Sequence, residues 1–218
     1  MIDLHIHSIF SDGELIPSEV VSRAIDAGYT HLAITDHVDP SNIDSVIERM
    51  AAVCADLRGV VRARVYPGVE ITHVPPRLIG PLAERGRAGG AAVVIVHGET
   101  IVEPVPRGTN RAAILAGVDI LAHPGLISEE EARLARRKGV LLEISARRGH
   151  SLANGHVASL AKKTGARLVY NTDSHAPGDF TPWEAALRII RGAGLSERDA
   201  RAMQENARAL VEGDRKKG

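Results

Sequence analysis

Short apolar runs rich in β-branched residues recur along the chain, and each is followed by a segment whose apolar residues have helical spacing. The apolar runs predict seven strands, at residues 2–7, 31–35, 64–71, 91–97, 119–123, 140–145 and 167–172. The segments between them are rich in Ala, Leu, Arg and Glu and predict helices at residues 18–27, 42–57, 78–88, 111–116, 129–137, 155–164 and 183–191. Strand and helix thus alternate about every 25–35 residues, which is the length of a βα unit.

Repeated βα units place parallel strands in either an open, doubly wound sheet or a closed barrel. A glycine-rich phosphate loop after the first strand would favour the open sheet, but that strand ends in His-Ile-His instead. No stretch rich in Pro, Gly and Ser divides the chain, so we expect a single domain over residues 1–212. Within it, residues 196–211 are expected to form a pair of short helices, and residues 213–218 a flexible tail.

Composition narrows the choice of function classes. Hydrophobic residues make up 44% of the 218 residues and charged residues 25%, which is typical of a globular protein. The 27 basic side chains are balanced by 27 acidic ones and aromatic residues are only 3%, so the composition does not indicate a nucleic-acid binder. Cys54 is the one cysteine, which excludes an internal disulfide. With neither a signal peptide nor an apolar run near the roughly 20 residues of a membrane span, we expect a cytoplasmic protein with no membrane partner.

The ten histidines are concentrated where the predicted strands end. Six of the seven strands are followed by His, Asp or Glu, and these residues are His5, His7, His37, Glu70, His97, His123, Asp173 and His175. The carboxyl ends of parallel strands lie at one edge, which in a barrel is the catalytic face, so we expect these side chains to converge. Alternation along a strand puts His5 and His7 on one face. The other face, turned toward the helices, would carry Ile2, Leu4 and Ile6.

Imidazoles and carboxylates packed together inside a barrel are costly unless a cation compensates them. With the aspartate of a Ser-Asp-Gly turn included, the set offers nine ligands: His5, His7, Asp12, His37, Glu70, His97, His123, Asp173 and His175. Because one ion takes about four to six ligands, nine of them indicate two or three divalent ions. Imidazole and carboxylate without thiolate favour Zn, Mn or Fe. Clustered ions of this kind suit hydrolysis, because they lower the pKa of bound water and clamp phosphoryl oxygens.

The order of these motifs resembles that of the PHP (polymerase and histidinol phosphatase) family. His-Ile-His, Ser-Asp-Gly, Thr-Asp-His, Gly-Val-Glu, Val-His-Gly, Ala-His-Pro and Thr-Asp-Ser-His follow one another along most of the chain. The resemblance implies a distorted seven-stranded (β/α)7 barrel of the TIM type that holds a trinuclear metal centre. The chain is also similar to short histidinol-phosphatase-like domains. It is shorter than the dedicated histidinol phosphatases of the family, so we expect it to lack some of their substrate-binding insertions.

The resemblance also implies how the ligands are divided among three ions. The first ion would be held by His5, His7, Glu70 and Asp173. The second ion, bridged to the first by Glu70, would be held by His97 and His123. The third ion would be held by Asp12, His37 and His175. A bridging hydroxide would attack phosphorus, with Glu70 as the shared ligand, while Asp173 and His175 would assist proton transfer.

Other residues at the same edge are candidates for contact with the substrate or for support of the ligands. A phosphate group needs a cation besides the metals, and the planar fork of arginine suits it. The candidates for substrate contact follow the fourth and sixth strands and are Arg111, Arg147, Arg148 and His150. Metal-bound imidazoles usually donate their other N–H to an acceptor, and Asp3 and Asp36 are the expected acceptors.

These features predict a metal-dependent phosphoesterase, a hydrolase that acts on a small phosphomonoester such as histidinol phosphate or a nucleotide. The alternative enzyme class is an amidohydrolase, which cleaves C–N bonds and also opens with His-x-His on a barrel. Many dinuclear amidohydrolases bridge their metals with a carboxylated lysine. Here the five lysines lie in predicted helices or the tail, and Glu70 stands at the bridging position. A nuclease for short oligonucleotides, or a binding module without catalysis, is less favoured, and the sequence indicates no oligomeric state.

Overall fold

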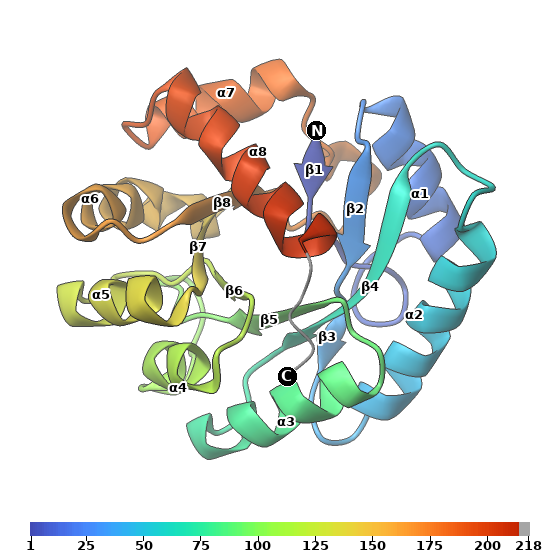
Figure 1. Ribbon diagram of the computed structural model, residues 1–218, viewed down its shortest axis with the longest axis horizontal. Coiled ribbons are helices and arrows are strands. Elements are labelled where there is room, and N and C mark those ends of the chain that lie inside the picture. Colours follow the sequence, from blue (N-terminus) through green and yellow to red (C-terminus); the bar gives the residue numbers. More distant parts are fainter. Residues whose placement is uncertain (214–218) are drawn as a thin grey trace.

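The computed structural model describes residues 1–213 and forms a nearly closed α/β barrel (Figure 1). Its strands are β1 (Ile2–Asp3), β2 (His31–Ile34), β3 (His37–Val38), β4 (Arg64–Ile71), β5 (Val93–His97), β6 (Ile120–Ala122), β7 (Leu141–Ser145) and β8 (Leu168–Asn171). Seven of them are neighbours in the order β1-β2-β4-β5-β6-β7-β8, all parallel, and β3 extends the edge beside β4. The ring closes where the Asp173 amide donates to the His5 carbonyl at 2.9 Å. The expected seven-stranded barrel is therefore confirmed.

Of the eight helices of the described chain, the first seven surround the barrel on the outer face of its sheet and the last crosses one end (Figure 1). They are α1 (Pro17–Asp26), α2 (Ile43–Leu57), α3 (Pro76–Ala88), α4 (Thr109–Ala116), α5 (Glu129–Lys138), α6 (Asn154–Thr164), α7 (Trp183–Gly192) and α8 (Glu197–Glu212). Two short 3-10 helices, η1 (His150–Ala153) and η2 (Pro177–Asp179), lie after β7 and β8. None of the helices in the described part is long and apolar enough to cross a membrane.

The C-terminal segment forms one helix rather than the expected pair. A capping box, in which the Ser196 hydroxyl accepts from the amide of Asp199, starts α8, and the helix continues for 16 residues. Neither Gly nor Pro interrupts it, and its buried face runs from Ala200 to Ala207. Of the flexible tail expected at residues 213–218, all but the first residue lie outside the described chain.

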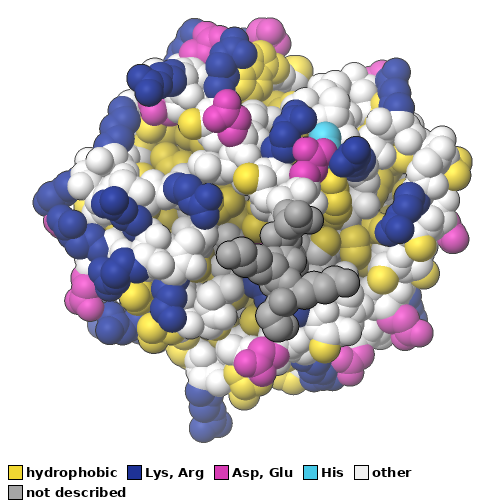
Figure 2. Space-filling model, in the orientation of Figure 1, with side chains coloured by type: hydrophobic (Ala, Val, Ile, Leu, Met, Phe, Trp, Pro, Cys, Tyr) yellow, Lys and Arg dark blue, Asp and Glu magenta, His cyan; other side chains and the backbone are white. Residues whose placement is uncertain are grey.

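Helix α8 crosses the amino-terminal end of the barrel, as Figure 1 shows. Gln204 accepts a hydrogen bond from the amide of Ile2 at 2.7 Å and donates one to the carbonyl of the same residue at 3.2 Å. Asn206 donates to the carbonyl of Leu168 at 2.8 Å. Because buried backbone groups must be paired, these side chains let the helix cover the starts of β1 and β8. Figure 2 shows the surface of this face, where basic and acidic side chains are scattered among apolar ones.

The strands are buried on both faces, because helices cover the outside and apolar side chains fill the inside. Ile2 and Leu4 join an inner cluster with Val93 and other apolar side chains of β5 to β8. The expected outward orientation of Ile2 and Leu4 is therefore wrong, whereas Ile6 packs with side chains of α1 as expected. The regular strand β1 ends at Asp3, so strict alternation does not continue along the chain.

The apolar filling occupies the lower part of the barrel and leaves the carboxyl ends of the strands to polar side chains. The register places these ends side by side, since His37 pairs with Glu70 and Glu70 pairs with Ile95. His97 in turn pairs with Ala122, the residue before His123. A polar layer therefore forms at one end of the barrel, above the apolar one.

Candidate metal centre

The structure brings all nine of the expected ligands to the carboxyl-terminal end of the barrel. Six of them are at most 3% exposed: His5, His7, Glu70, His97, His123 and Asp173. His175 is 9% exposed, and His37 and Asp12 lie nearer the surface. The cluster is therefore closed below by the apolar filling and opens to solvent on the side of Asp12.

Glu70 lies at the middle of the cluster and presents its two oxygens to different imidazoles. Oε2 is 3.2 Å from Nε2 of His5 and 3.4 Å from Nε2 of His7. Oε1 is 3.5 Å from Nδ1 of His97 and 3.6 Å from Nε2 of His123. None of these contacts has the geometry of a hydrogen bond, and Nδ1 of His37 lies 2.8 Å from Oε2 as a further ion pair. The carboxylate thus stands where it could bridge two ions.

Asp173 faces the same imidazoles from the opposite side of the barrel. Its Oδ1 is 3.3 Å from Nε2 of His7 and 3.7 Å from Nε2 of His5, and its Oδ2 is 3.8 Å from Nε2 of His123. The backbone of Asp173 has a φ of 55°, and that of His123 a φ of 25°. Non-glycine residues rarely adopt such angles, and strain of this kind gathers at functional sites where the surroundings enforce it.

Three further ligands form an outer group nearer the solvent. Oδ1 of Asp12 is 3.1 Å from Nε2 of His175 and 3.5 Å from Nε2 of His37. The other ring nitrogen of His37 lies 2.7 Å from the Thr72 hydroxyl, and that of His175 lies 3.0 Å from the carbonyl of Asp173. These contacts leave both Nε2 atoms directed toward Asp12.

The strongest sign of a metal centre is the number of buried polar atoms that lack a hydrogen-bond partner. Within the described residues they are His5 Nε2, both ring nitrogens of His7, His97 and His123, and both oxygens of Glu70. Buried polar groups are almost always paired, because each unpaired one costs roughly 1–3 kcal/mol. The ligand atoms also group in sets of three or four within 4.8 Å of one another. Nitrogen and oxygen donors in this arrangement fit divalent ions.

The pKa values of three ligands, His97, His5 and Asp173, are raised within the cluster. Burial would lower the pKa of His97, but the carboxylates of Glu103 and Glu70 outweigh burial and raise it to about 9. Burial likewise opposes protonation of His5, whose neighbouring carboxylates nevertheless raise its pKa well above the usual value. Burial and the nearby Glu70 raise the pKa of Asp173 to about 7. A cation that binds here therefore competes with protons.

Glu143 orients two of the ligands, although the sequence pattern does not single it out. Its Oε1 accepts from Nδ1 of His5 at 2.8 Å and from the side-chain amide of Asn171 at 2.8 Å. Its Oε2 accepts from the backbone amide of His123 at 3.0 Å. Donation from Nδ1 leaves Nε2 of His5 directed at Glu70. An acidic residue inside an otherwise apolar strand is the signal that could have revealed it.

Asp3 and Asp36, the expected acceptors for imidazole N–H groups, hold other groups instead. Asp3 accepts from the amide and the hydroxyl of Thr172, and so joins β1 to the end of β8. Asp36 accepts from the hydroxyls of Ser8 and Ser11 and fixes the loop that follows β1. The expectation that these two carboxylates accept from the imidazoles is therefore wrong, and Glu143 takes that role for one ligand.

Glu103, in the loop between β5 and α4, meets three imidazoles at the mouth of the centre. Its Oε2 is 3.0 Å from Nε2 of His97 and 3.2 Å from Nε2 of His73. Its Oε1 is 3.4 Å from Nε2 of His150. The sequence does not reveal this residue, because a loop carries no periodicity that would place its side chains.

A pocket of about 260 Å³ opens above the centre. Its lining is almost entirely polar and consists of Asp12, His37, Thr72, His73, His97, Glu103, Arg147, His150, Asp173 and His175. Two of the four candidates for substrate contact, Arg147 and His150, therefore line it. Nη1 of Arg147 donates to the carbonyl of Asp173 at 3.2 Å, and Nδ1 of His150 lies 2.7 Å from the Thr100 hydroxyl.

The two other candidates for substrate contact lie outside this pocket. Arg148 is exposed and does not line it. Arg111 pairs with Glu130, with 2.8 Å between Nη1 and Oε1, so its guanidinium joins α4 to α5. Neither side chain is therefore placed to hold a phosphate group bound in the pocket.

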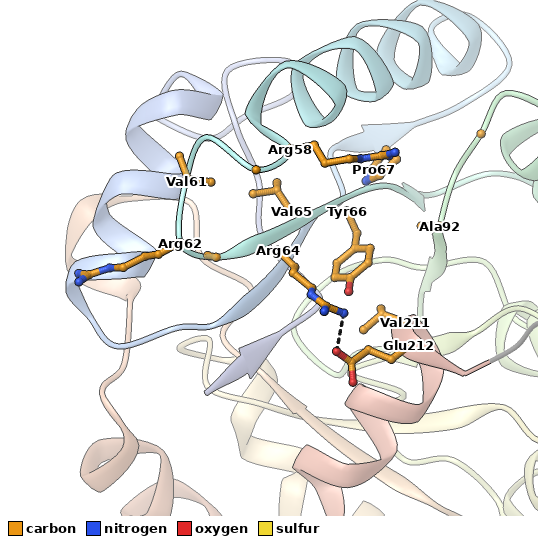
Figure 3. Close-up of a pocket in the computed structure, with 13 residues that line it drawn as sticks. Arg58, Val61, Arg62, Arg64, Val65, Tyr66, Pro67, Ala92, Val211 and Glu212 are labelled. Atoms are coloured by element: carbon orange, nitrogen blue, oxygen red, sulfur yellow. Dashed lines mark hydrogen bonds and ion pairs between the residues drawn. The ribbon is translucent and has the colours of Figure 1, made fainter.

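A larger hollow, of about 790 Å³, lies at the opposite end of the barrel (Figure 3). It is formed by the connection from α2 to β4, the first half of β4 and the end of α8. An ion pair of 2.7 Å between Arg64 and Glu212 crosses it. Its described lining contains one carboxylate and no imidazole, so it lacks the set of ligands that a metal centre needs, whatever its size.

Comparison with known proteins finds a family and relatives that match most of this chain. A sequence model of the PHP domain family matches residues 3–147. The chain is 44% identical over 202 residues to the uncharacterized protein MJ1295 of Methanocaldococcus jannaschii, covering 90% of this chain and 91% of that protein. It is 27% identical over 200 residues to the 5'-3' exoribonuclease Rnm of Escherichia coli K12, covering 88% of this chain and 62% of that one.

Solved structures include a similar fold. The histidinol phosphate phosphatase of Lactococcus lactis, solved with zinc, L-histidinol and phosphate, superposes with a TM-score of 0.59 at 19% identity. The superposition covers 89% of this chain and 94% of that one. At this level of identity the comparison concerns the fold alone.

Proposed function

This chain belongs to the PHP domain family, and on that premise we propose that it is a metal-dependent phosphoesterase that hydrolyses a small phosphomonoester. The observation that carries the proposal is the group of buried ring nitrogens and carboxylate oxygens without hydrogen-bond partners. These atoms face one another beneath a pocket that also presents an arginine. Hydrolysis of a phosphate ester needs both features, cations to hold the phosphoryl oxygens and a hydrogen-bond donor on the side away from them.

Two or three divalent ions, Zn, Mn or Fe, would be held by the nine ligands. We assign to the first ion His5, His7, Glu70 and Asp173. We assign to the second Glu70, His97 and His123, and to the third Asp12, His37 and His175. When bound, such ions supply the positive charge that polarises a phosphoryl group and lowers the pKa of water.

The chain's own residues would position the substrate and move protons. Arg147 lies beside Asp173, with 3.8 Å between Nε and Oδ2, and its side chain remains one-third exposed toward the pocket. Its planar fork matches two phosphoryl oxygens. Asp173 and His175 would assist proton transfer, since Nδ1 of His175 is 3.4 Å from the Asp173 carboxylate. Glu70 would contribute by holding two ions together.

The substrate would be a compact phosphomonoester such as histidinol phosphate or a nucleotide. A pocket of about 260 Å³ accommodates a phosphoryl group and the atoms next to it, not a long polymer. The phosphatase fold shared with the L. lactis protein supports this choice. A second candidate, removal of residues from the end of a short oligonucleotide, is favoured by the similarity to the exoribonuclease Rnm.

An amidohydrolase reaction is less well supported by the geometry. The described lining of the pocket contains no lysine that could carry a bridging carboxylate. The lysines at positions 138, 162 and 163 lie in α5 and α6, outside the barrel. Two carboxylates, Glu70 and Asp173, lie between the two groups of imidazoles.

The test is phosphate release from histidinol phosphate, mononucleotides, sugar phosphates and a short oligonucleotide, with Mn or Zn added. We expect at least one phosphomonoester to be hydrolysed, and Asp173→Asn to reduce turnover by about 100-fold or more. Asp56→Asn, an exposed carboxylate on α2, is the matched control and should leave turnover unchanged. Equal turnover in wild type and Asp173→Asn would contradict the proposal.

A further inference from the structure

The exposed apolar side chains of this protein gather at one end of the barrel. Eight large hydrophobic side chains among the described residues are at least 46% exposed. Six of them lie on segments that follow strands at the carboxyl end: Ile9, Ile16, Ile101, Val102, Leu126 and Leu152. Of the two others, Val60 follows α2 and Leu115 lies near the end of α4. Single exposed apolar residues are normal, but a concentration around one opening indicates a binding surface.

Four of these side chains belong to three loops that pack against one another. We call them the apolar rim, formed by Ile101, Val102, Leu126 and Leu152. Gly125, the neighbour of Leu126, lies so close to the loop after β5 that a Cβ there would be 1.9 Å from the carbonyl oxygen of Glu99. Gly149, just before η1, lies against Val102, and a Cβ there would be 3.4 Å from its methyl group. The loops after β5, β6 and β7 therefore form one surface.

The apolar rim is continuous with the wall of the pocket. Val102 is followed directly by Glu103, which lines the pocket. The hydroxyl of Thr100 and Nδ1 of His150 lie 2.7 Å apart and join the loop after β5 to η1. His150 lines the pocket and is two residues from Leu152. The part of a bound molecule that extends out of the pocket would therefore lie beside the apolar rim.

The size and polarity of the pocket indicate which part of a substrate would bind to the apolar rim. About 260 Å³ lined by charged and polar side chains suits a phosphoryl group, and the rest of a substrate must extend beyond it. Apolar surface that stays in water is unfavourable, and an apolar group laid on it removes both surfaces from water. The rim thus supplies the apolar half of a site whose polar half is the pocket.

We propose that the apolar rim binds the leaving group of the substrate, so that the enzyme prefers phosphomonoesters whose alcohol is apolar or aromatic next to the phosphate. This inference rests on the proposed phosphoesterase function and names its substrate class. A second copy of the chain or a partner protein on the same surface would be a different result, which the experiment distinguishes.

The test uses n-alkyl phosphates from ethyl to hexyl, which differ in apolar area but little in the basicity of the leaving alcohol. We expect kcat/KM with Mn or Zn to rise about tenfold or more from ethyl to hexyl phosphate, since one fully buried methylene contributes up to about fourfold. Val102→Ser and Leu152→Ser should bring the hexyl-to-ethyl ratio close to one. Val60→Ser and Leu115→Ser, which change exposed apolar residues outside the rim, should keep the wild-type ratio.

The outcomes separate this inference from the proposed function. Equal kcat/KM for ethyl and hexyl phosphate in the wild type would overturn the role of the rim and leave the phosphoesterase standing. A chain-length preference that survives both rim substitutions would overturn it too. Loss of a dimer in Val102→Ser, seen by sedimentation with the preference unchanged, would assign the rim to a second copy instead. No hydrolysis of any ester by the metal-loaded protein would overturn both proposals.

Discussion

Each imidazole of the metal centre can offer either of two ring nitrogens, and for His5 and His37 a hydrogen-bond partner holds one of them. Glu143 accepts from Nδ1 of His5 and so leaves Nε2 toward the centre. Nδ1 of His37 lies 2.7 Å from the Thr72 hydroxyl and 2.8 Å from Oε2 of Glu70, which leaves its Nε2 toward Asp12. Outer partners of this kind fix the orientation of the ring before any ion binds, which reduces the entropy lost on binding. Of these two partners, Glu143 is the more deeply buried, with no exposed surface.

We expect Glu143→Gln to weaken zinc binding by about 10- to 100-fold, the usual effect of losing an outer partner of a metal-bound histidine. The glutamine keeps the size of the side chain. It cannot accept at both ends, so either His5 or the backbone amide of His123 loses its acceptor. Competition with a zinc-binding dye measures the affinity directly.

Glu84→Gln, at an exposed position of α3, is the matched control and should bind zinc as the wild type does. Unchanged zinc affinity in Glu143→Gln, with the melting temperature preserved, would show that the orientation of His5 does not depend on this carboxylate.

At the scale of the element, α8 has a stabilising role that is separate from the chemistry. It lies across the amino-terminal end of the barrel, opposite the metal centre, and pairs with the backbone of β1 and β8. Barrels of this architecture separate stability at one end from chemistry at the other. Changes in α8 should therefore alter stability without altering the metal centre.

We expect Ser196→Ala to lower the free energy of unfolding by about 1 kcal/mol, because it removes the hydroxyl that accepts from the amide of Asp199 at the start of α8. Urea unfolding followed by circular dichroism measures the change. Ser22→Ala, at an exposed interior position of α1, removes a hydroxyl without a capping role and should not destabilise. An equal effect of the two substitutions would contradict a capping role for Ser196.

At the scale of the whole molecule, the barrel consists of an apolar layer and a polar layer, which are stabilised by different interactions. The apolar layer is stable by burial alone, whereas the polar layer holds ring nitrogens and carboxylate oxygens without partners. Anything that satisfies those atoms in the folded state, and has no site in the unfolded chain, stabilises the fold by mass action.

We expect Mn or Zn at about 100 times its dissociation constant to stabilise the fold by about 2.7 kcal/mol, which for a chain of this size raises the melting temperature by about 5–10 °C. A chelator should reverse the shift. Differential scanning fluorimetry with and without metal measures it, and His123→Ala should show a smaller shift.

The rise in melting temperature caused by metal should also grow as the pH rises from about 6 to 9. Without metal, the pKa of His97 is raised to about 9, so this imidazole is protonated at neutral pH and must release its proton to bind an ion. The proton itself stabilises the metal-free fold below that pKa, and this contribution is lost as the pH rises through it. Both effects increase the difference in stability between the metal-bound and the metal-free protein as the pH rises. A shift that is independent of pH would contradict protonation of His97 in the metal-free protein.

Two expectations from local sequence patterns, the pair of C-terminal helices and the outward orientation of Ile2 and Leu4, are corrected by the structure. The single helix α8 replaces an expected pair, because the capping box and the continuous buried face outweigh the polar composition of the segment. Ile2 and Leu4 turn inward against strict alternation, because β1 is regular only to Asp3. In both cases packing against the rest of the barrel decided a conformation that the local sequence left open.

The sequence by itself determined the alternating strands and helices, and with them the edge at which the nine candidate ligands would gather, because strand ends are set by local hydrophobic periodicity. Only the tertiary structure decided which oxygen of Glu70 faces which imidazole, that Glu143 rather than Asp3 accepts from the ring of His5, and that Glu103 lies at the mouth of the centre. These contacts depend on distances of a few ångströms between side chains that are far apart along the chain. No periodicity of the sequence carries that information, since it arises when the barrel closes.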